Sequence, residues 1–255
     1  MGDHERAIAS GQRALAAAGD HLPTRIATNL YLGYGYDALG DYRRANDALG
    51  ESLRHLTGPR RYEHSGLAPL PAVSAGSRLA QCFAELGEFP RGEAHGETAL
   101  EIAETAGHTI SRIQACRGLG MLCMRRGELD RAEALLGRGL MLSREVHLPL
   151  ELPVIASAVG SVHLLAGRQE KALELLEEAV EQARALKRVD QQALRLVALG
   201  TGYLASGRLD AAWTLFQDAM ESARAQRERG AEGLHPAAWR STGQCRRARR
   251  AGIGR

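Results

Sequence analysis

A recurring segment at intervals of about 40 residues constrains this chain more than any other feature. Five nine-residue segments begin with Leu or Val, carry a small residue at their second position and end in Gly. Their closing glycines are Gly40, Gly87, Gly127, Gly167 and Gly207, at intervals of 47, 40, 40 and 40 residues. Such a period is typical of chains built from stacked copies of one small unit. We therefore expect a repeat protein.

Each unit is expected to be a pair of helices, because apolar residues of helical period flank each closing Gly. Gly suits the left-handed turn after a first helix, and Asp41, Glu88 and Glu128 are expected to cap the second. Small residues before and after the turn predict close packing: Gly33, Ala80, Gly120, Gly160 and Gly200, then Ala45, Gly92, Ala132, Ala172 and Ala212. The predicted helices are 3–18, 22–39, 41–56, 72–86, 88–105, 109–126, 128–145, 151–166, 168–186, 189–206 and 208–228.

The order Leu-Gly-x-x-Tyr-x-x-x-Gly-x-x-x-x-Ala, with Ala again seven residues later, resembles the tetratricopeptide repeat (TPR) over about residues 1–225. The resemblance implies an all-α, right-handed superhelical solenoid of about five helical hairpins. The period of 40 exceeds the usual 34 and implies longer helices or loops. We expect a solenoid domain over 1–229 and a basic, disordered tail over 230–255.

Two segments, Leu79–Phe89 and Gly66–Pro71, resemble the C-terminal TPR arms of bacterial signalling ATPases and class III adenylate cyclase-like regulators. This resemblance implies a non-catalytic regulatory scaffold in the cytoplasm of a bacterium, with any catalytic domain outside this chain. The alternative is a free-standing TPR scaffold that binds a peptide or an amphipathic helix in its concave groove.

The sequence carries few signs of catalysis, so we expect no enzyme, no cofactor and no metal. It lacks a phosphate-binding G-x-x-x-x-G-K-[ST] loop, an H-E-x-x-H pair and a G-x-S-x-G elbow. The starts of a dinucleotide motif at Gly33 and Gly118 do not continue to a third Gly. His163 and Cys123 occupy the slot of a large residue between helices, and Cys116 lies two turns before Cys123, so packing is the favoured role of all three.

Binding is the more promising class, because first helices line the concave groove of TPR stacks. Counting back from each closing Gly gives groove positions that run from polar to apolar along the chain, which favours a protein or peptide partner such as an amphipathic helix. Met adapts to varied partner surfaces. The open alternative is that longer helices bury these positions. The candidates are Tyr34, Asp37, Gln81, Glu85, Arg117, Met121, Met124, Arg125, Ser161, Leu164 and Leu204.

The net charge of +3 is uneven, because residues 231–255 hold six Arg and one Glu. The rest of the chain is slightly acidic, which argues against nucleic-acid binding outside the tail. Three interpretations of the tail stay open: a disordered segment, a reading-frame slip and a functional basic arm. The chain also opens with a second helix that lacks its first, so it could be a fragment of a larger protein.

Signals for export and membranes are weak, and we expect a cytoplasmic chain without a membrane anchor. The N-terminus lacks an apolar signal core, and the four Cys form no C-x-x-C pair. The most apolar window, residues 146–167, is interrupted by Glu151 and two Pro, and matches a first helix of the repeat. Seven extra residues fall near Gly58–Pro71, which is either a connector or a contact loop.

Overall fold

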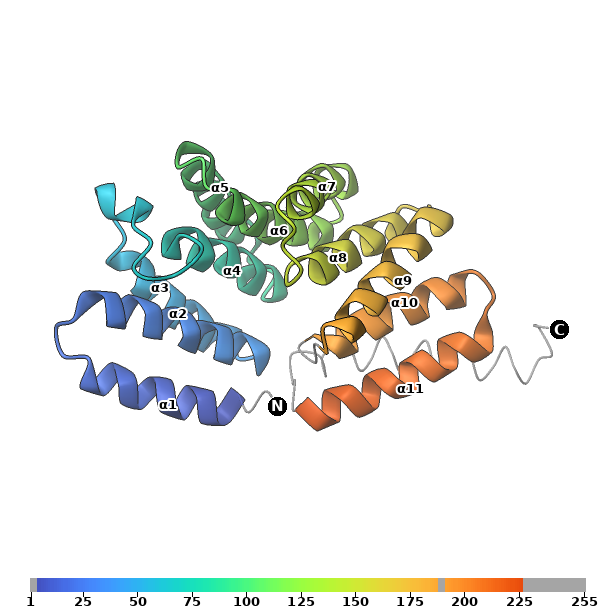
Figure 1. Cartoon of the computed structure of the whole chain (residues 1–255), viewed down its shortest axis with the longest axis horizontal. Helices are drawn as coiled ribbons and strands as arrows, with labels where there is room; N and C mark the ends of the chain where they lie inside the picture. Colours follow the sequence, from blue (N-terminus) through green and yellow to red (C-terminus); the bar gives the residue numbers. More distant parts are fainter. Residues whose placement is uncertain (1–3, 188–190, 227–255) are drawn as a thin grey trace. The chain divides into compact units, whose positions relative to one another are not determined.

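The computed structural model describes residues 4–187 and 191–226 (Figure 1). This part of the chain forms eleven α-helices and one short 3-10 helix, η1, and contains no strand. Every predicted helix is confirmed, with ends that shift by two residues at most, apart from the predicted ends at 3, 189 and 228, which lie outside the described residues. The tail predicted at 230–255 lies outside the described residues. The elements are α1 (His4–Ala17), α2 (Leu22–Ala38), α3 (Tyr42–Arg54), η1 (Gly58–Tyr62), α4 (Pro71–Glu85), α5 (Phe89–Thr105), α6 (Thr109–Arg126), α7 (Leu129–Glu145), α8 (Leu152–Leu165), α9 (Gln169–Ala185), α10 (Gln192–Ala205) and α11 (Leu209–Gln226).

The helices gather in two compact units. The N-terminal unit, Asp3–Val146, holds α1 to α7, and the C-terminal unit begins at His147 and holds α8 to α11. The single solenoid domain expected over residues 1–229 stays a prediction.

In the N-terminal unit, α1 packs on α2, and the next six α-helices form the hairpins α2–α3, α4–α5 and α6–α7 (Figure 1). Helix α4 lies at the centre, because it contacts α2, α3, α5 and α6. Twelve of its fifteen residues are buried. Val73 of α4 joins one apolar cluster with Ile102 of α5, whereas Leu79 joins another with Leu30 and Leu49. The unit therefore shares one helix between two cores.

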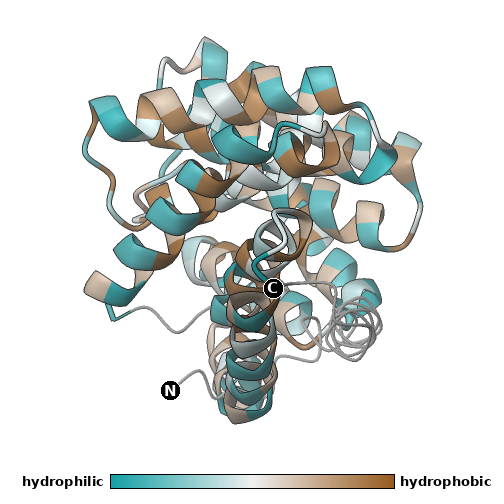
Figure 2. Cartoon of the chain, turned by 90° about the vertical axis from the view of Figure 1, so that its right-hand side faces the viewer, coloured by the Kyte–Doolittle hydropathy of each residue, from teal (hydrophilic) through white to brown (hydrophobic). Residues whose placement is uncertain are grey.

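The C-terminal unit consists of the hairpins α8–α9 and α10–α11, in which α10 also contacts α8 and α9. Leu176 of α9, Leu196 of α10 and Leu215 of α11 belong to one apolar cluster. Apolar and hydrophilic residues alternate along individual helices (Figure 2), as amphipathic packing requires.

The closing glycines behave as the sequence predicts. All five have a positive φ between 74° and 86°, a region that residues with a Cβ rarely adopt. The predicted caps are confirmed in part. The Asp41 side chain accepts the backbone N–H of Arg44 at 3.2 Å. Glu88 and Glu128 were expected to cap α5 and α7 but make no such bond. Each carboxylate instead turns to a nearby guanidinium, at 2.5 Å from Arg91 and 2.6 Å from Arg126 respectively.

In each hairpin, a glycine on one helix faces a residue with a side chain on the other, and this pair sets how closely the two helices approach. Seven residues before the closing Gly, the first helix carries Gly33, and a Cβ built there would lie 2.5 Å from Cγ of Leu49 on the second helix. The same pairing joins Gly120 to Leu136, Gly160 to Leu176 and Gly200 to Phe216. The second hairpin reverses it: Ala80 stands on α4, and its counterpart on α5 is Gly96. In this hairpin the glycine therefore lies on the second helix, and the residue with a side chain lies on the first.

The connection between α3 and α4, residues 55–70, accommodates the extra residues of the 47-residue interval. Its two ends are fixed in the core, because Leu56 and Leu70 are buried, and η1 lies between them. Leu67 packs against the cluster that contains Leu30 and Leu79. The connection is therefore attached to the unit at several points.

Candidate functional site

Helices α2, α4 and α6 are the first helices of their hairpins, and they place predicted site residues on neighbouring turns. We call the residues Tyr34, Asp37, Arg78, Gln81, Glu85, Met121, Met124 and Arg125 the first-helix face of the N-terminal unit. The contacts of α4 with both α2 and α6 bring these residues together across three hairpins.

An ion pair joins α2 to α4 within this face. A guanidinium nitrogen of Arg78 donates to Oδ2 of Asp37 at 2.9 Å, and the same guanidinium lies 4.9 Å from the ring centroid of Tyr34. The thiol of Cys82 donates to the other carboxylate oxygen of Asp37 at 3.4 Å. Asp37 is thus a partner of two α4 side chains, and it helps to set the spacing of the two helices.

A second ion pair joins α4 to α6. Nη2 of Arg125 lies 2.8 Å from Oε1 of Glu85, and both side chains are about a third exposed. Because solvent reaches this pair, either partner can exchange it for a ligand group at small cost. The first-helix face therefore presents one charged pair that is accessible to a partner.

Burial holds the nearby titratable groups in their neutral forms. It raises the pKa of the Tyr42 phenol well above its usual range, and the carboxylates of Glu85 and Asp37 add to the shift. Burial, followed by the charge of Asp37, likewise raises the pKa of the Cys82 thiol. A protonated, fully buried thiol is a poor nucleophile and a poor metal ligand.

Of the candidates on α6, one does not lie on the accessible face. Met121 and Met124 are half-buried and Arg125 is exposed, but Arg117 retains only 8% exposure. Arg117 stands beside Gly118, where a Cβ would lie 2.6 Å from the carbonyl oxygen of Ser77 on α4. Arg117 is therefore buried, in line with the alternative that the helices bury these positions, and its role in binding stays a prediction.

The predicted candidates of the C-terminal unit form a less polar set on α8 and α10. The Ser161 hydroxyl donates to the carbonyl of Ser157 at 2.8 Å, and is therefore used within its own helix. Leu164 packs against the apolar cluster of Leu176 and Leu196, and Leu204 packs against Phe216. These two leucines are only half-buried. Their neighbour Leu165 is 62% exposed.

Counting from the closing glycines missed Arg78 of the first-helix face and Tyr31, which contacts that face. Arg78 holds Asp37, and Tyr31, which is 58% exposed, stacks edge-to-face on Tyr34 with ring centroids 6.2 Å apart. Both lie nine residues before their closing Gly. The same count, extended by one helical turn, would have found them.

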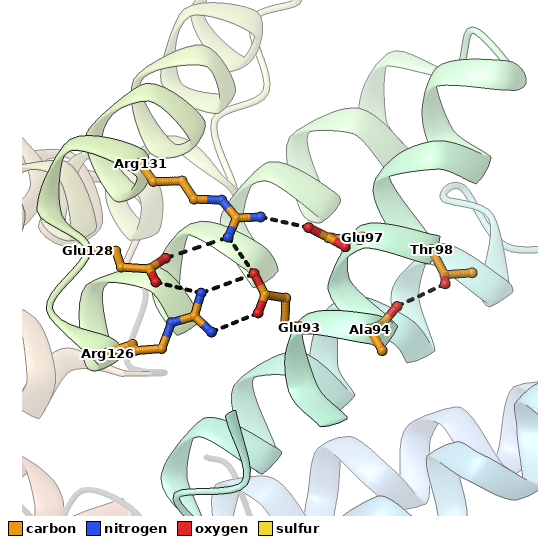
Figure 3. A network of polar contacts seen from close by, with 7 residues as sticks. All are labelled: Glu93, Ala94, Glu97, Thr98, Arg126, Glu128 and Arg131. Carbon is orange, nitrogen blue, oxygen red and sulfur yellow. Dashed lines mark hydrogen bonds and ion pairs between the residues drawn. The ribbon is translucent and has the colours of Figure 1, made fainter. Parts of the chain in front are cut away.

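The largest polar network of the N-terminal unit lies apart from this face. Glu93 of α5 accepts hydrogen bonds from Arg126 of α6 and Arg131 of α7 (Figure 3). Arg131 also bonds Glu97, and both arginines pair with Glu128. These hydrogen bonds lower the pKa of Glu93 to about 2, because they stabilise its carboxylate. The network joins two hairpins, which is a structural role.

The core assignments made from the sequence are confirmed. Cys116 and Cys123 are fully buried, and His163 retains 7% exposure. Within the described residues, no group of three or more His, Cys, Asp or Glu side chains is placed to hold a metal ion. None of the described helices combines the length and the apolar character that crossing a membrane requires.

Comparisons with known proteins agree with this architecture. Residues 151–225 match the tetratricopeptide repeat family. Among solved structures, BtubC (BKLC) from P. vanneervenii is similar with a TM-score of 0.63 and 19% identity, over 88% of this chain and 92% of that one. A Rap protein complexed with Competence and Sporulation Factor has a TM-score of 0.63 and 13% identity, over 96% and 72%. A thermophilic TPR protein from Thermus thermophilus has a TM-score of 0.56 and 22% identity, over 82% and 98%.

These similarities show a TPR-like, all-helical fold. They confirm the resemblance drawn from the repeated Gly and Ala positions. No curated protein sequence matches the chain.

Proposed function

We propose that this TPR-like chain is a non-catalytic interaction module that holds a peptide or an amphipathic helix against the first-helix face of its N-terminal unit. TPR-type repeats generally serve as protein-interaction scaffolds. The observation that carries the proposal is the accessible Glu85–Arg125 pair, which joins two first helices beside the adaptable side chains of Met121 and Met124. A charged pair next to flexible apolar groups suits a helix with one apolar and one polar side.

A structural neighbour gives the proposal further support. The Rap protein with a similar fold was solved with Competence and Sporulation Factor bound. In the C-terminal unit, Ser161, Leu164 and Leu204 are proposed to supply mostly apolar contacts of their own.

Selection from a displayed library of helix-forming peptides tests this proposal. The selected peptides are expected to lose at least about tenfold in affinity, or about 1.4 kcal/mol, when Glu85→Arg is introduced. Glu97→Arg is the matched control, because Glu97 is an exposed glutamate on α5, away from the first-helix face. Peptides that bind both variants equally, or a library without a binder, would contradict the proposed surface.

A narrower proposal concerns the parent protein. The resemblance of Leu79–Phe89 and Gly66–Pro71 supports a regulatory arm of a bacterial signalling ATPase or adenylate cyclase-like protein. An antibody against the chain, used on extracts of its source cells, tests this. A band far above 27.5 kDa that contains an ATPase or cyclase module is expected. A native band near that mass would favour the free-standing scaffold.

A further inference from the structure

The connection between α3 and α4 is fastened to the start of α6 by a buried hydrogen bond. The backbone N–H of Leu70 donates to Oγ of Ser111 at 2.9 Å, across 41 residues of sequence. Leu70 and Ser111 are both buried. Because Leu70 also immediately precedes α4, this bond anchors the last residue of the connection to two helices at once.

The anchor depends on the protonation of a histidine. His108 is the N-cap of α6, and its Nδ1 accepts the backbone N–H of Ser111 at 3.3 Å. The same Nδ1 lies 2.9 Å from Oγ of Ser111. Depending on the tautomer, Nδ1 accepts from this hydroxyl or donates to it, because the oxygen has lone pairs for both Nδ1 and the Leu70 N–H. Only an unprotonated Nδ1 can accept the Ser111 backbone N–H, so a proton on Nδ1 removes the cap at the residue that holds Leu70.

A second histidine comes from the connection itself. The rings of His64 and His108 lie edge-to-face, with centroids 4.8 Å apart and planes at 77°. Two protonated imidazoles at this distance would repel each other. The positive end of the α6 dipole adds a further penalty for charge on His108. A proton at this position therefore opposes both the cap and the contact with the connection.

Charged residues lie near the two histidines in the sequence. Glu63 precedes His64 on the connection, and Arg112 follows on α6. Arg112 and Arg138 of α7 both pair with Glu104 of α5, at 3.3 and 2.5 Å. Their charges are thereby engaged with one another. The acid sensitivity of this corner is accordingly set by the two imidazoles.

We propose that residues 63–70 form a proton-sensitive latch, which is fastened to α6 at neutral pH and released when His108 takes up a proton. Release withdraws Leu67 from the apolar cluster of Leu30 and Leu79, and so uncovers part of that cluster. The latch lies outside the proposed peptide-binding face and does not depend on it.

The direction of the pH effect follows from the environment of His108. Burial lowers its pKa below the usual 6.5, and the neighbouring His64 lowers the pKa further. Below pH 6.5 the released state therefore binds more protons than the latched state. The latch is at full strength above pH 6.5 and weakens as the pH falls from there toward the lowered pKa.

Hydrogen exchange at the Leu70 amide tests the latch in the full chain. After correction for the intrinsic pH dependence of exchange, we expect protection to fall between pH 7.5 and 5.5, by at most about tenfold for the uptake of one proton. In His108→Asn the side-chain oxygen still caps α6 but does not titrate, so protection is expected to be independent of pH. Equal protection of the wild type at both pH values, or the same loss in His108→Asn, would overturn the proposal.

Two further variants separate the latch from a general acid effect. His64→Ala removes one cause of the lowered pKa of His108, so protection is expected to depend less on pH than in the wild type. His21→Asn is the matched control, because His21 caps α2 through Thr24 in the same way but has no second imidazole stacked on it in the described residues. An unchanged pH dependence in His64→Ala, or an equal change in His21→Asn, would show that the imidazole pair does not control release.

Discussion

At the scale of the residue, glycine has two opposite roles within one hairpin. Gly120 of α6 leaves room for the second helix, because a Cβ there would lie 2.7 Å from Cγ of Leu136. Gly137 of α7 has no neighbouring atom within 4 Å of its Cβ position. The first glycine is required by packing, whereas the second only weakens its helix through its conformational freedom.

These roles predict opposite effects of the same substitution. Gly120→Ala is expected to lower the free energy of unfolding by about 1–3 kcal/mol, through overpacking against Leu136. Gly137→Ala is expected to raise it by about 0.5–1 kcal/mol, because Ala is the better helix former. Urea unfolding of the two variants measures both changes. If the free energy of unfolding changes in the same direction in both variants, helix propensity, and not the packing of α6 on α7, determines the effect of these substitutions.

The residue scale also shows what the sequence could predict. The small residues at Gly33, Gly120 and Ala45 were assigned to packing from their spacing alone, because the constraint acts inside one repeat. The burial of Arg117 was not predictable in this way. At the neighbouring Gly118 a Cβ would lie 2.6 Å from the carbonyl oxygen of Ser77 in the preceding hairpin, and the period does not encode that approach.

At the scale of the element, the arginine that follows each of the first three closing glycines by four residues shows how one repeat differs from the next. Arg44 lies over the ring of Tyr36 at 5.9 Å, and Arg91 lies over Phe83 at 4.3 Å. In the third hairpin the corresponding aromatic position holds Cys123, which offers no ring. Arg131 instead bonds Glu93 of the preceding hairpin. The lost contact within a hairpin is replaced by one between hairpins.

Glu93 should therefore make the junction of α5 with α6 and α7 sensitive to acid. Its pKa of about 2 lies below the ordinary 4.5, so the unfolded chain binds more protons between these values. Its contribution to stability is complete above pH 4.5 and is lost as the pH falls toward 2. Because the side chain is about a quarter exposed, solvent screening reduces this contribution to about 1 kcal/mol.

Replacement of Glu93 by Gln tests this contribution. The variant is expected to unfold about 1 kcal/mol more easily than the wild type at pH 7, and the difference should shrink as the pH falls below 4. Thermal unfolding at several pH values provides the measurement. Glu97→Gln, which removes a more exposed carboxylate bonded to Arg131 alone, should have a smaller effect at pH 7. A difference that stays constant with pH would mean that the carboxylate charge is not involved.

Sequence patterns located the helices well, but they described the connections poorly. The α3–α4 connection was recognised by its seven extra residues, yet its attachment through Ser111 lies 41 residues beyond Leu70. The same limit explains Glu88 and Glu128, which were expected to cap helices. Each has an arginine within three residues, and the ion pair competes with the backbone for the carboxylate.

At the scale of the molecule, the helices separate into an N-terminal and a C-terminal unit although the repeat pattern continues through both. The period treats every junction between hairpins alike, so it could not indicate a division after Val146. Val146 and Leu150, in the connection from α7 to α8, keep exposed apolar side chains. In stacked repeats, stability is approximately a sum of contributions from each repeat and its nearest neighbours.

A destabilising substitution in one unit should therefore reduce the stability of that unit and leave the other unit folded. Phe216 is fully buried against Gly200, and Phe216→Ala is expected to cost about 3–5 kcal/mol. Hydrogen exchange should show lost protection in α10 and α11, with little change in α2 to α4. Leu49→Ala, at the equivalent position of the first hairpin, should give the opposite distribution. A uniform loss of protection in either variant would indicate that the chain unfolds as a single cooperative body.

The reversed pair at Ala80 and Gly96 limits how such a chain can be rearranged by recombination. A breakpoint inside a hairpin that joins α4 to the second helix of another repeat would set a leucine or phenylalanine against the methyl group of Ala80. A breakpoint between hairpins leaves every pair intact. Duplications and deletions in the history of this gene are thus expected to begin and end at hairpin boundaries, and libraries of shuffled repeats should respect the same boundaries.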